Sequence, residues 1–288
     1  MTDWETRFAE VVRRRTREAT AAVLPPLKTV EGGATDDLDT VGNRWTRRLF
    51  DGDFFLSRVS RLSNVTRDIP ATGLVFVQSR DGNTGARNPS SLGGGETDKH
   101  LIYDGLSRVA ANGVLAGAET IRGSKVIFSV WHPELVELRA AMGLPRHPIQ
   151  IVATLGGLTF DDTLLFNVPE LPVIVISTAV WVEKMKEALA RRPWIRTVAM
   201  AQPDDLPSAF RGLRSIGVAR ISAIGGRTIA RAMIDAGLVQ DLYLTTSPRP
   251  GGEPNTPLSP TPLNGTLVVR KLGTGPEAGV VFEHLILK

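Results

Sequence analysis

The 288-residue chain contains no cysteine, which excludes disulfide bonds, thiolate nucleophiles and cysteine-ligated metal sites together. No apolar run approaches the roughly 20 residues that a membrane-spanning helix needs, and the first residues lack the pattern of a secretory signal. We therefore expect a soluble, cytoplasmic protein with no membrane partner. Histidine is scarce and scattered, so we expect no metal site and place each histidine on the surface or in a loop: His100, His132, His147 and His284.

Several nucleotide-binding and hydrolase motifs are missing too. No G-x-G-x-x-G follows the first expected strand, and the chain has no Walker A sequence, no G-x-S-x-G and no H-E-x-x-H. The 34 basic and 30 acidic residues give a formal charge of +4, which suits an anionic small ligand but does not argue for nucleic acid. Arg13, Arg14, Arg15 and Arg17 could contact nucleic acid, but a solvated helix face is the favoured interpretation.

What is present begins with an amphipathic pattern over residues 3–24, which predicts a helix that ends at Pro25-Pro26. Residues 28–44 are rich in turn formers and are expected to form a loop. The apolar stretch 45–62 is expected to pack on the main domain or on a partner subunit. We interpret residues 1–70 as an N-terminal helical extension.

From Thr72 onward, strands alternate with helices, which predicts an α/β domain. One strand starts at Gly113 and runs into a turn of small residues. The other expected strands are 74–78, 149–154, 173–177, 197–201, 220–224 and 241–247, and the expected helices are 96–111, 180–191, 205–216 and 227–236. Two further strands within 266–272 and 279–287 predict an antiparallel hairpin, which makes the sheet mixed.

One junction has the pattern of a ligand site. A β-branched strand that starts at Arg220 meets Gly225-Gly226, and an amphipathic helix follows. Such a junction aims the unpaired amides of the first helical turn beyond the end of the strand, and the glycines let a ligand approach the backbone. A phosphate group fits there, although the same pair also suits a simple tight turn.

Four separated segments then occur in a characteristic order: Ser79-x-Asp81-Gly82, the stretch from Val114 to Arg122, Gly225-Gly226, and the stretch from Ala236 to Leu242 that leads to Pro248. Together they resemble the RibD C-terminal domain family, the riboflavin-biosynthesis reductases of the dihydrofolate-reductase-like superfamily. The resemblance covers about residues 72–287. It implies a three-layer α/β/α domain over residues 71–288 with a mixed, mostly parallel sheet and an antiparallel C-terminal hairpin.

The resemblance also implies NADPH as cofactor. Gly117 and Thr120 match the family's G-x-G-T turn, in which Glu119 replaces the second glycine. Gly225 and Gly226 match the pair that lies against the cofactor phosphates. The resemblance also places the amides of Arg227, Thr228 and Ile229 at the cofactor, and the hydroxyls of Ser177 and Thr178 near its adenosine half. Arg122 and Lys125 are candidates for binding the 2′-phosphate; the alternative is that both side chains are simply exposed to solvent.

The activity implied is NADPH-dependent reduction, with hydride transfer to a small carbonyl or imine such as a phosphoribosylamino-pyrimidine, as in 5-amino-6-(5-phosphoribosylamino)uracil reductases. Ser79, Asp81 and Glu119 are expected to border the substrate, with Asp81 and Glu119 as weak catalytic candidates; a turn role for Asp81 is the alternative. The apolar Leu74 to Val77 replaces a lysine or asparagine that the family has before its S-x-D-G turn, and residues 132–139 lack the family's aspartates.

The substrate therefore stays open at this point. A reductase of a pterin-like compound and a catalytically idle nucleotide-binding sensor or interaction protein are the alternatives. The zinc deaminase half that is fused to many family members is expected to be missing, because residues 1–70 are too short for it and contain no cysteine. A homodimer is expected, both from the resemblance and from the apolar stretch 45–62.

Overall fold

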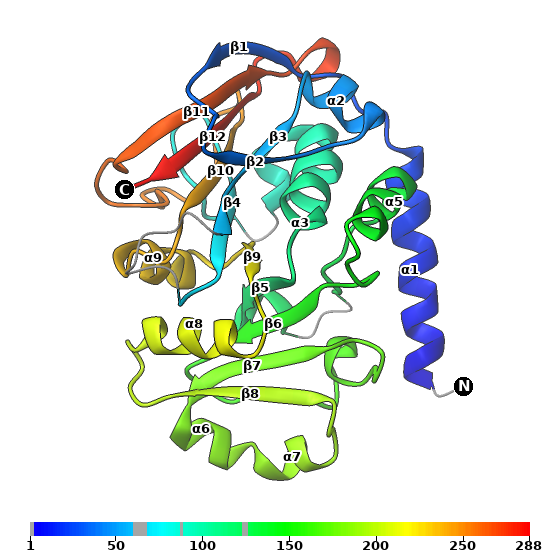
Figure 1. Ribbon diagram of the computed structural model, residues 1–288, viewed down its shortest axis with the longest axis vertical. Helices are drawn as coiled ribbons and strands as arrows, with labels where there is room; N and C mark the ends of the chain where they lie inside the picture. The colour runs from blue at the N-terminus through cyan, green and yellow to red at the C-terminus, as the bar shows by residue number, and fades with distance from the viewer. Residues whose placement is uncertain (1–2, 60–67, 87–88, 123–125) are drawn as a thin grey trace.

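The structure is a computed structural model that describes residues 3–59, 68–86, 89–122 and 126–288 (Figure 1). Its centre is a ten-stranded sheet with the order β1-β11-β12-β10-β4-β9-β5-β6-β7-β8. The strands are β1 (Lys28–Gly32), β4 (Ala71–Gln78), β5 (Gly113–Gly117), β6 (Ile149–Ala153), β7 (Val173–Thr178), β8 (Ile195–Met200), β9 (Arg220–Ala223), β10 (Asp241–Thr246), β11 (Gly265–Leu272) and β12 (Val281–Leu287).

The seven strands from β10 to β8 are parallel, whereas β12, β11 and β1 add antiparallel pairs at one edge. The central strands are apolar on both faces, as expected for parallel strands that are covered by helices on each side. The mixed, mostly parallel sheet and the antiparallel C-terminal hairpin confirm the fold class expected from the sequence.

Two helical layers cover the sheet (Figure 1). On one face, α8 (Leu206–Ser215) and α9 (Arg227–Asp235) bury Phe210, Leu213 and Met233 against the strands. The other face is covered by the π-helix η3 (Thr97–Leu106), α3 (Ser107–Val109), α5 (Pro133–Ala141), α6 (Ala179–Lys184) and α7 (Lys186–Ala190). Shorter helical turns are η2 (Pro89–Leu92), α4 (Ala118–Ile121), η4 (Leu164–Phe166) and η5 (Gly275–Glu277).

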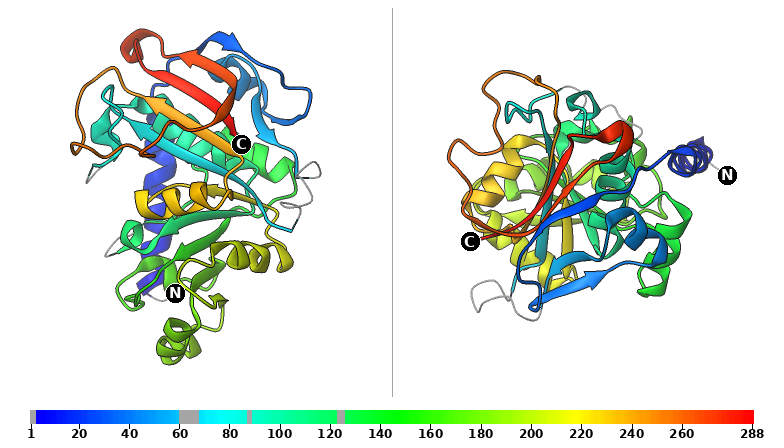
Figure 2. Two further views of the ribbon diagram at one scale, coloured as in Figure 1. Left: turned by 90° about the vertical axis from the view of Figure 1, so that its left-hand side faces the viewer. Right: turned by 90° about the horizontal axis from the view of Figure 1, so that it is seen from above.

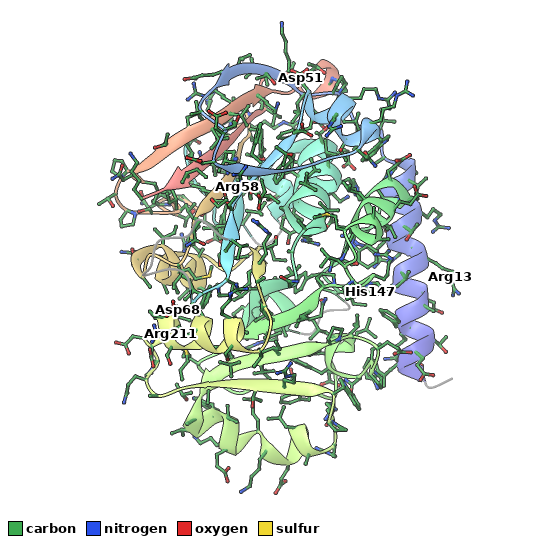
Figure 3. The ribbon with its side chains drawn as sticks, in the orientation of Figure 1. Arg13, Asp51, Arg58, Asp68, His147 and Arg211 are labelled. Carbon is green, nitrogen blue, oxygen red and sulfur yellow. The ribbon has the colours of Figure 1, made fainter. Side chains whose placement is uncertain are left out.

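The first helix, α1 (Asp3–Ala21), confirms the amphipathic pattern and lies at the periphery of the molecule (Figure 2). Its buried Val11 and Ala19 pack with Trp131 and other apolar residues of the domain. Arg15, on the same helix, reaches Asp104 of η3 at 2.7 Å. Arg13 points from the outer side of α1 into solvent (Figure 3), which agrees with a solvated helix face.

The prediction of a loop over residues 28–44 is wrong, because this segment forms two strands, β1 and β2 (Leu38–Val41). β1 pairs with β11 at the edge of the sheet, and β2 pairs with β3 (Phe54–Ser57). β1 is largely exposed and has one apolar side chain, Val30, and β2 is only four residues long, so neither strand carries a clear apolar alternation in the sequence. The N-terminal extension is therefore not purely helical, while its boundary at residue 70 stays a prediction.

The apolar stretch that follows packs on the main domain. Within it, α2 (Arg44–Phe50) and β3 place Phe50 and Phe54 against Phe282, and Phe54 also meets Tyr243 with ring centroids 4.7 Å apart. Residues 60–62 lie outside the described residues. Because the two phenylalanines are covered by the chain itself, they no longer argue for a partner subunit.

Two histidines are not where the sequence analysis placed them. His100 and His284 are 3% and 1% exposed, so the expectation of a surface or loop position is wrong for both. Nε2 of His284 lies 2.8 Å from Oδ1 of Asp241, which compensates the cost of burying both groups. Among the described residues, no group of His, Asp and Glu side chains has the arrangement of a metal site.

Candidate functional site

The order of the strands places a switch point at β9. The chain leaves β4 and β5 toward the face that carries η3, α3 and α5, but it leaves β9 toward the face of α9. β9 lies between β4 and β5 in the sheet. The connection that leaves β9 therefore runs to the opposite face from the connections that leave its two neighbouring strands. In open α/β sheets, ligands bind in the crevice that such divergence leaves outside the carboxyl ends of the strands.

The glycine pair lies at this point. Gly226 has a φ of +75°, a left-handed conformation that side chains disfavour, and it is the N-cap of α9. No side chain caps this helix, and the first helical hydrogen bond runs from the amide of Ala230 to the carbonyl of Gly226. The amides of Arg227, Thr228 and Ile229 are therefore the free amides of the first turn. Arg227 and Thr228 are exposed.

The turn after β5 meets the glycine pair. A β-carbon on Gly117 would lie 3.7 Å from Cγ2 of Ile229, and one on Gly225 would lie 3.4 Å from Oγ1 of Thr120. The structure thus brings together Gly117, Thr120 and the Gly225-Gly226 junction, which the sequence analysis assigned to one cofactor site. Gly117 thus faces the side chain of Ile229 and Gly225 that of Thr120, while the exposed Gly226 leaves the backbone at the start of α9 accessible to a ligand.

The charged residues of the β5 turn pair with each other. Arg122 Nη2 lies 2.7 Å from Oε1 of Glu119, and both side chains are largely exposed. The glutamate that replaces a family glycine is therefore neutralised locally. Arg122, which was expected to bind a 2′-phosphate, is thus paired with Glu119 in this structure. Lys125 lies outside the described residues.

Ser177 and Thr178 end β7, two strands away from β5. Ser177 is fully buried and its Oγ has no hydrogen-bond partner, although buried hydroxyls are normally paired. Thr178 is the N-cap of α6, and its Oγ1 accepts a 3.4 Å hydrogen bond from the amide of Trp181. The two hydroxyls thus lie, like the glycines, at the carboxyl ends of the parallel strands. The Thr178 hydroxyl already has a hydrogen-bond partner, whereas the Ser177 hydroxyl has none.

Ser79 and Asp81 hold the turn after β4. Ser79 is fully buried, and its backbone and Oγ both engage Asn83. Asp81 is exposed, and its Oδ2 accepts the amide of Gly251 at 3.2 Å, in the loop that follows β10. Both residues are at the carboxyl edge expected for the substrate. Their observed contacts are those of turn and loop formation.

An acidic group that the sequence analysis did not single out lies at the same edge. Asp98 of η3 accepts a 2.5 Å hydrogen bond from Oγ1 of Thr245, near the carboxyl end of β10. Burial raises the pKa of the Asp98 carboxyl to about 7; the Thr245 hydrogen bond opposes this rise, and Glu277 and Asp104 add to it. In the sequence, the feature that could have pointed to Asp98 is the run Gly93 to Gly95 just before this helix, because consecutive glycines let the backbone pass close to neighbouring groups.

A second concave region lies elsewhere. A depression of about 440 Å³ is lined by Pro145, Arg146, His147, Pro172 and Trp194, among others. These residues precede β6, β7 and β8, so the depression opens at the amino ends of the strands, opposite the glycine pair. None of the site residues expected from the sequence lies there. The switch at β9, and not this depression, is therefore our candidate site.

The model of the RibD C-terminal domain family matches residues 72–273. The chain belongs to this family. The match confirms the resemblance that the ordered segments predicted. It makes the chain a member of the riboflavin-biosynthesis reductase family, whose enzymes use a nicotinamide cofactor. No curated protein matches the chain in sequence.

Solved structures share the fold. A pyrimidine reductase-like protein from Corynebacterium diphtheriae superposes with a TM-score of 0.62 at 22% identity, over 79% of this chain and 96% of that one. RibD from Acinetobacter baumannii gives 0.58 at 17% identity and covers 77% of this chain and 58% of that one. The riboflavin biosynthesis reductase of Saccharomyces cerevisiae gives 0.53 at 17% identity, over 77% and 91%. Among the described residues, no helix is both long and apolar enough to span a membrane.

Proposed function

We propose that this protein is an NADPH-dependent reductase that transfers hydride to a carbonyl or imine carbon of a phosphoribosylamino-pyrimidine. The single observation that carries the proposal is the contact between the Gly225-Gly226 junction and the Gly117-to-Thr120 turn at the switch strand β9. Family membership supports the reductase class and a nicotinamide cofactor.

The residues present fit a dinucleotide. The exposed Gly226 lets the pyrophosphate approach the backbone, and the uncapped first turn of α9 supplies amides that anions prefer. Arg227 adds a cation beside them and takes part in no ion pair among the described residues. The unpartnered Oγ of Ser177, two strands from β5, offers a hydrogen bond to the adenosine half.

When bound, the nicotinamide supplies the hydride and its electron pair, and the protein has to position the two reactants and exclude water. The turn after β4 and the loop after β10 are joined by a hydrogen bond from the amide of Arg80 to the carbonyl of Arg249 at 2.9 Å. Both arginine side chains are exposed, and neither forms an ion pair with another described residue. Two arginines without ion-pair partners, at the carboxyl ends of β4 and β10, support a phosphate-bearing substrate over a neutral one.

The decisive experiment follows NADPH oxidation by the loss of its near-ultraviolet absorbance, with 5-amino-6-(5-phosphoribosylamino)uracil and with a dihydropterin as separate substrates. Thermal stabilisation by NADPH is measured in parallel. Turnover of the pyrimidine supports the proposal, and turnover of the pterin alone replaces its substrate. Stabilisation without turnover of either indicates a nucleotide-binding sensor, and absence of stabilisation overturns the cofactor assignment.

A matched variant separates the site from the fold. Gly225 has no left-handed φ, so Gly225→Val introduces a side chain without backbone strain, and its β-carbon is only in van der Waals contact with Thr120. We expect this variant to fold as the wild type does and to lose NADPH stabilisation. Unchanged NADPH affinity in Gly225→Val would rule out this junction as the phosphate site.

A further inference from the structure

The depression at the amino ends of β6, β7 and β8 contains a basic side chain that has no ion-pair partner among the described residues. Its volume of about 440 Å³ lies in the range of small-molecule sites. Arg146 and His147, in the loop between α5 and β6, line one part of it. Trp194 lines another part, together with exposed prolines. The depression thus combines a few polar nitrogen atoms with an apolar wall, as ligand sites usually do.

Arg146 keeps one edge of its guanidinium group free. Its Nη1 donates to Oγ of Ser129 at 3.0 Å and to the carbonyl of Val130 at 2.6 Å. Nε and Nη2 have no hydrogen-bond partner among the described residues, and neither atom is shut off from solvent. The N–H groups of these two atoms are parallel and form the fork that binds both oxygens of a carboxylate.

Ser129 holds His147 beside Arg146 and determines its tautomer. The fully buried Ser129 has its Oγ 2.9 Å from Nδ1 of His147 and 3.5 Å from the carbonyl of Arg146. The single hydroxyl proton belongs to the shorter contact, so Nδ1 is the acceptor and Nε2 carries the ring proton. Burial, followed by Arg146 and Arg139, lowers the pKa of His147 to about 4, so the ring is neutral at pH 7. Its Nε2 has no partner among the described residues and offers a second donor.

The positive charge around the depression is not compensated by the protein. Arg139, in α5, donates to backbone carbonyls, among them those of Pro145 at 2.6 Å and Ala111 at 2.7 Å. Burial and the nearby Arg146 lower the pKa of Arg139 to about 10. Neither arginine forms an ion pair with a described residue. Cations that are withdrawn from water without a counter-ion are costly, and a bound anion lowers that cost.

Glu170 restricts the charge of that anion. It lines the depression, is exposed and has no ion-pair partner among the described residues, so it repels a ligand with two negative charges. We propose that the depression binds a small aromatic monocarboxylate, with its carboxylate on the free fork of Arg146 and on Nε2 of His147, and its ring against Trp194. This site is separate from the cofactor site, because it lies at the opposite ends of the strands.

An NMR titration of the isotope-labelled protein tests the carboxylate, with indole-3-acetate as the probe and indole-3-acetamide as its neutral counterpart of similar shape. We expect indole-3-acetate to bind one site per chain with a Kd of about 1 mM or below. The amide should bind at least about tenfold more weakly, because it accepts no charge-assisted hydrogen bonds. Equal affinities would show an apolar surface without carboxylate recognition and would overturn the proposal, as would the absence of saturable binding.

Two variants test the fork. Arg146→Gln should lose at least about tenfold in affinity for indole-3-acetate, and Arg146→Lys, which keeps the charge without the fork, should lose most of that affinity as well. The matched control is Arg191→Gln, because Arg191 is exposed before β8, does not line the depression and forms no ion pair with a described residue. The control should bind as wild type does. Equal losses in Arg146→Gln and Arg191→Gln would reduce the effect to net charge and overturn the assignment.

A third variant gives the opposite sign, which a folding defect cannot imitate. Arg146→Gln also gives up the hydrogen bond to Val130, so its loss of affinity alone is not decisive. Glu170→Gln removes the opposing charge from an exposed position. At low salt it should therefore bind indole-3-acetate about two- to threefold more tightly than wild type. An unchanged or lower affinity would mean that Glu170 does not face the ligand and would contradict the assigned charge selectivity.

Competition experiments separate this site from other occupants. Saturating NADPH should leave the affinity for indole-3-acetate unchanged, and mutual exclusion would place the probe in the cofactor site instead. Inorganic phosphate at the same concentration should not displace the probe; displacement would make the depression a phosphate site. Sedimentation equilibrium covers the remaining occupant, because a dimer that Arg146→Gln dissociates would assign the depression to a second copy of this chain. Each of these three results would overturn the proposal of an aromatic monocarboxylate site.

Discussion

Thr120 of the turn after β5 and Gly225 of the junction after β9 face each other so closely that a β-carbon on the glycine would lie 3.4 Å from the threonine Oγ1. Neighbouring strands bring them together, since β9 pairs with β5 in parallel through Ile221 and Ala223. Two glycine-containing turns that are far apart in sequence thus form one surface. Whether that surface binds a dinucleotide can be tested residue by residue.

The first prediction separates backbone strain from ligand binding at Gly226. Its φ of +75° means that Gly226→Ala should cost about 1–2 kcal/mol of stability even without any ligand. Gly143, at the end of α5, has a φ of +71° and open space around it, so Gly143→Ala is the matched strain control. Both variants should melt earlier in thermal scans, but only Gly226→Ala should lose NADPH stabilisation. Equal NADPH stabilisation in the two would contradict the assignment.

The second prediction concerns the cation at the start of α9. Arg227→Ala should weaken NADPH binding by about 1 kcal/mol, or roughly fivefold, and the loss should shrink at high salt. Arg231→Ala is the control, because Arg231 lies one turn further along α9 and faces Asp235 at 3.7 Å. Titration calorimetry at two salt concentrations measures both. An Arg227→Ala affinity equal to that of the control would remove Arg227 from the site.

The third prediction is a loss of stability in acid that involves His147. Figure 3 shows this side chain beside α1, where its ring meets Phe8 with centroids 5.5 Å apart. Burial, together with the neighbouring Arg146 and Arg139, lowers the pKa of His147 from 6.5 to about 4. Between these values the unfolded chain binds more protons than the folded one, so stability decreases as pH falls from 6.5 to 4.

The loss attributable to His147 is at most about 3.4 kcal/mol, from 1.36 kcal/mol per unit of the shift from 6.5 to about 4. His147→Gln does not titrate and can keep a hydrogen bond to Ser129, whose Oγ lies 2.9 Å from Nδ1. The difference between the two proteins in urea unfolding, followed across this pH window, isolates the histidine. Parallel pH dependences for wild type and variant would show that His147 does not cause the loss.

The fourth prediction concerns a buried carboxylate that joins the N-terminal extension to the domain. Asp241 is 1% exposed and accepts hydrogen bonds from the amide and the hydroxyl of Ser57, besides its contact with His284. Asp241→Ala should therefore cost about 3–5 kcal/mol, whereas the exposed Asp235→Ala should stay within about 0.5 kcal/mol. Urea unfolding measures both. A loss below 1 kcal/mol for Asp241→Ala would mean that β3 is not anchored there.

Much of the fold was predictable because its central strands are short apolar runs between turn residues. Helices cover both faces of β4, β7 and β10, so these strands are nearly continuous apolar runs that can be recognised in the sequence alone. Helices α8 and α9 likewise present apolar stripes at helical spacing. The four ordered segments from Ser79 to Pro248 likewise predicted the family, which the family model confirms.

The central sheet, the covering helices and the glycine pair were predictable from the sequence, because each depends on the pattern of residues within one short segment. Features that depend on distant partners follow only from the folded chain: β1 finds its hydrogen bonds on β11, and burial, together with Glu277 and Asp104, raises the pKa of Asp98 against the opposing hydrogen bond from Thr245. An aspartate in a helix looks the same in sequence whether solvent or a folded chain surrounds it. Its chemistry is set by that surrounding chain.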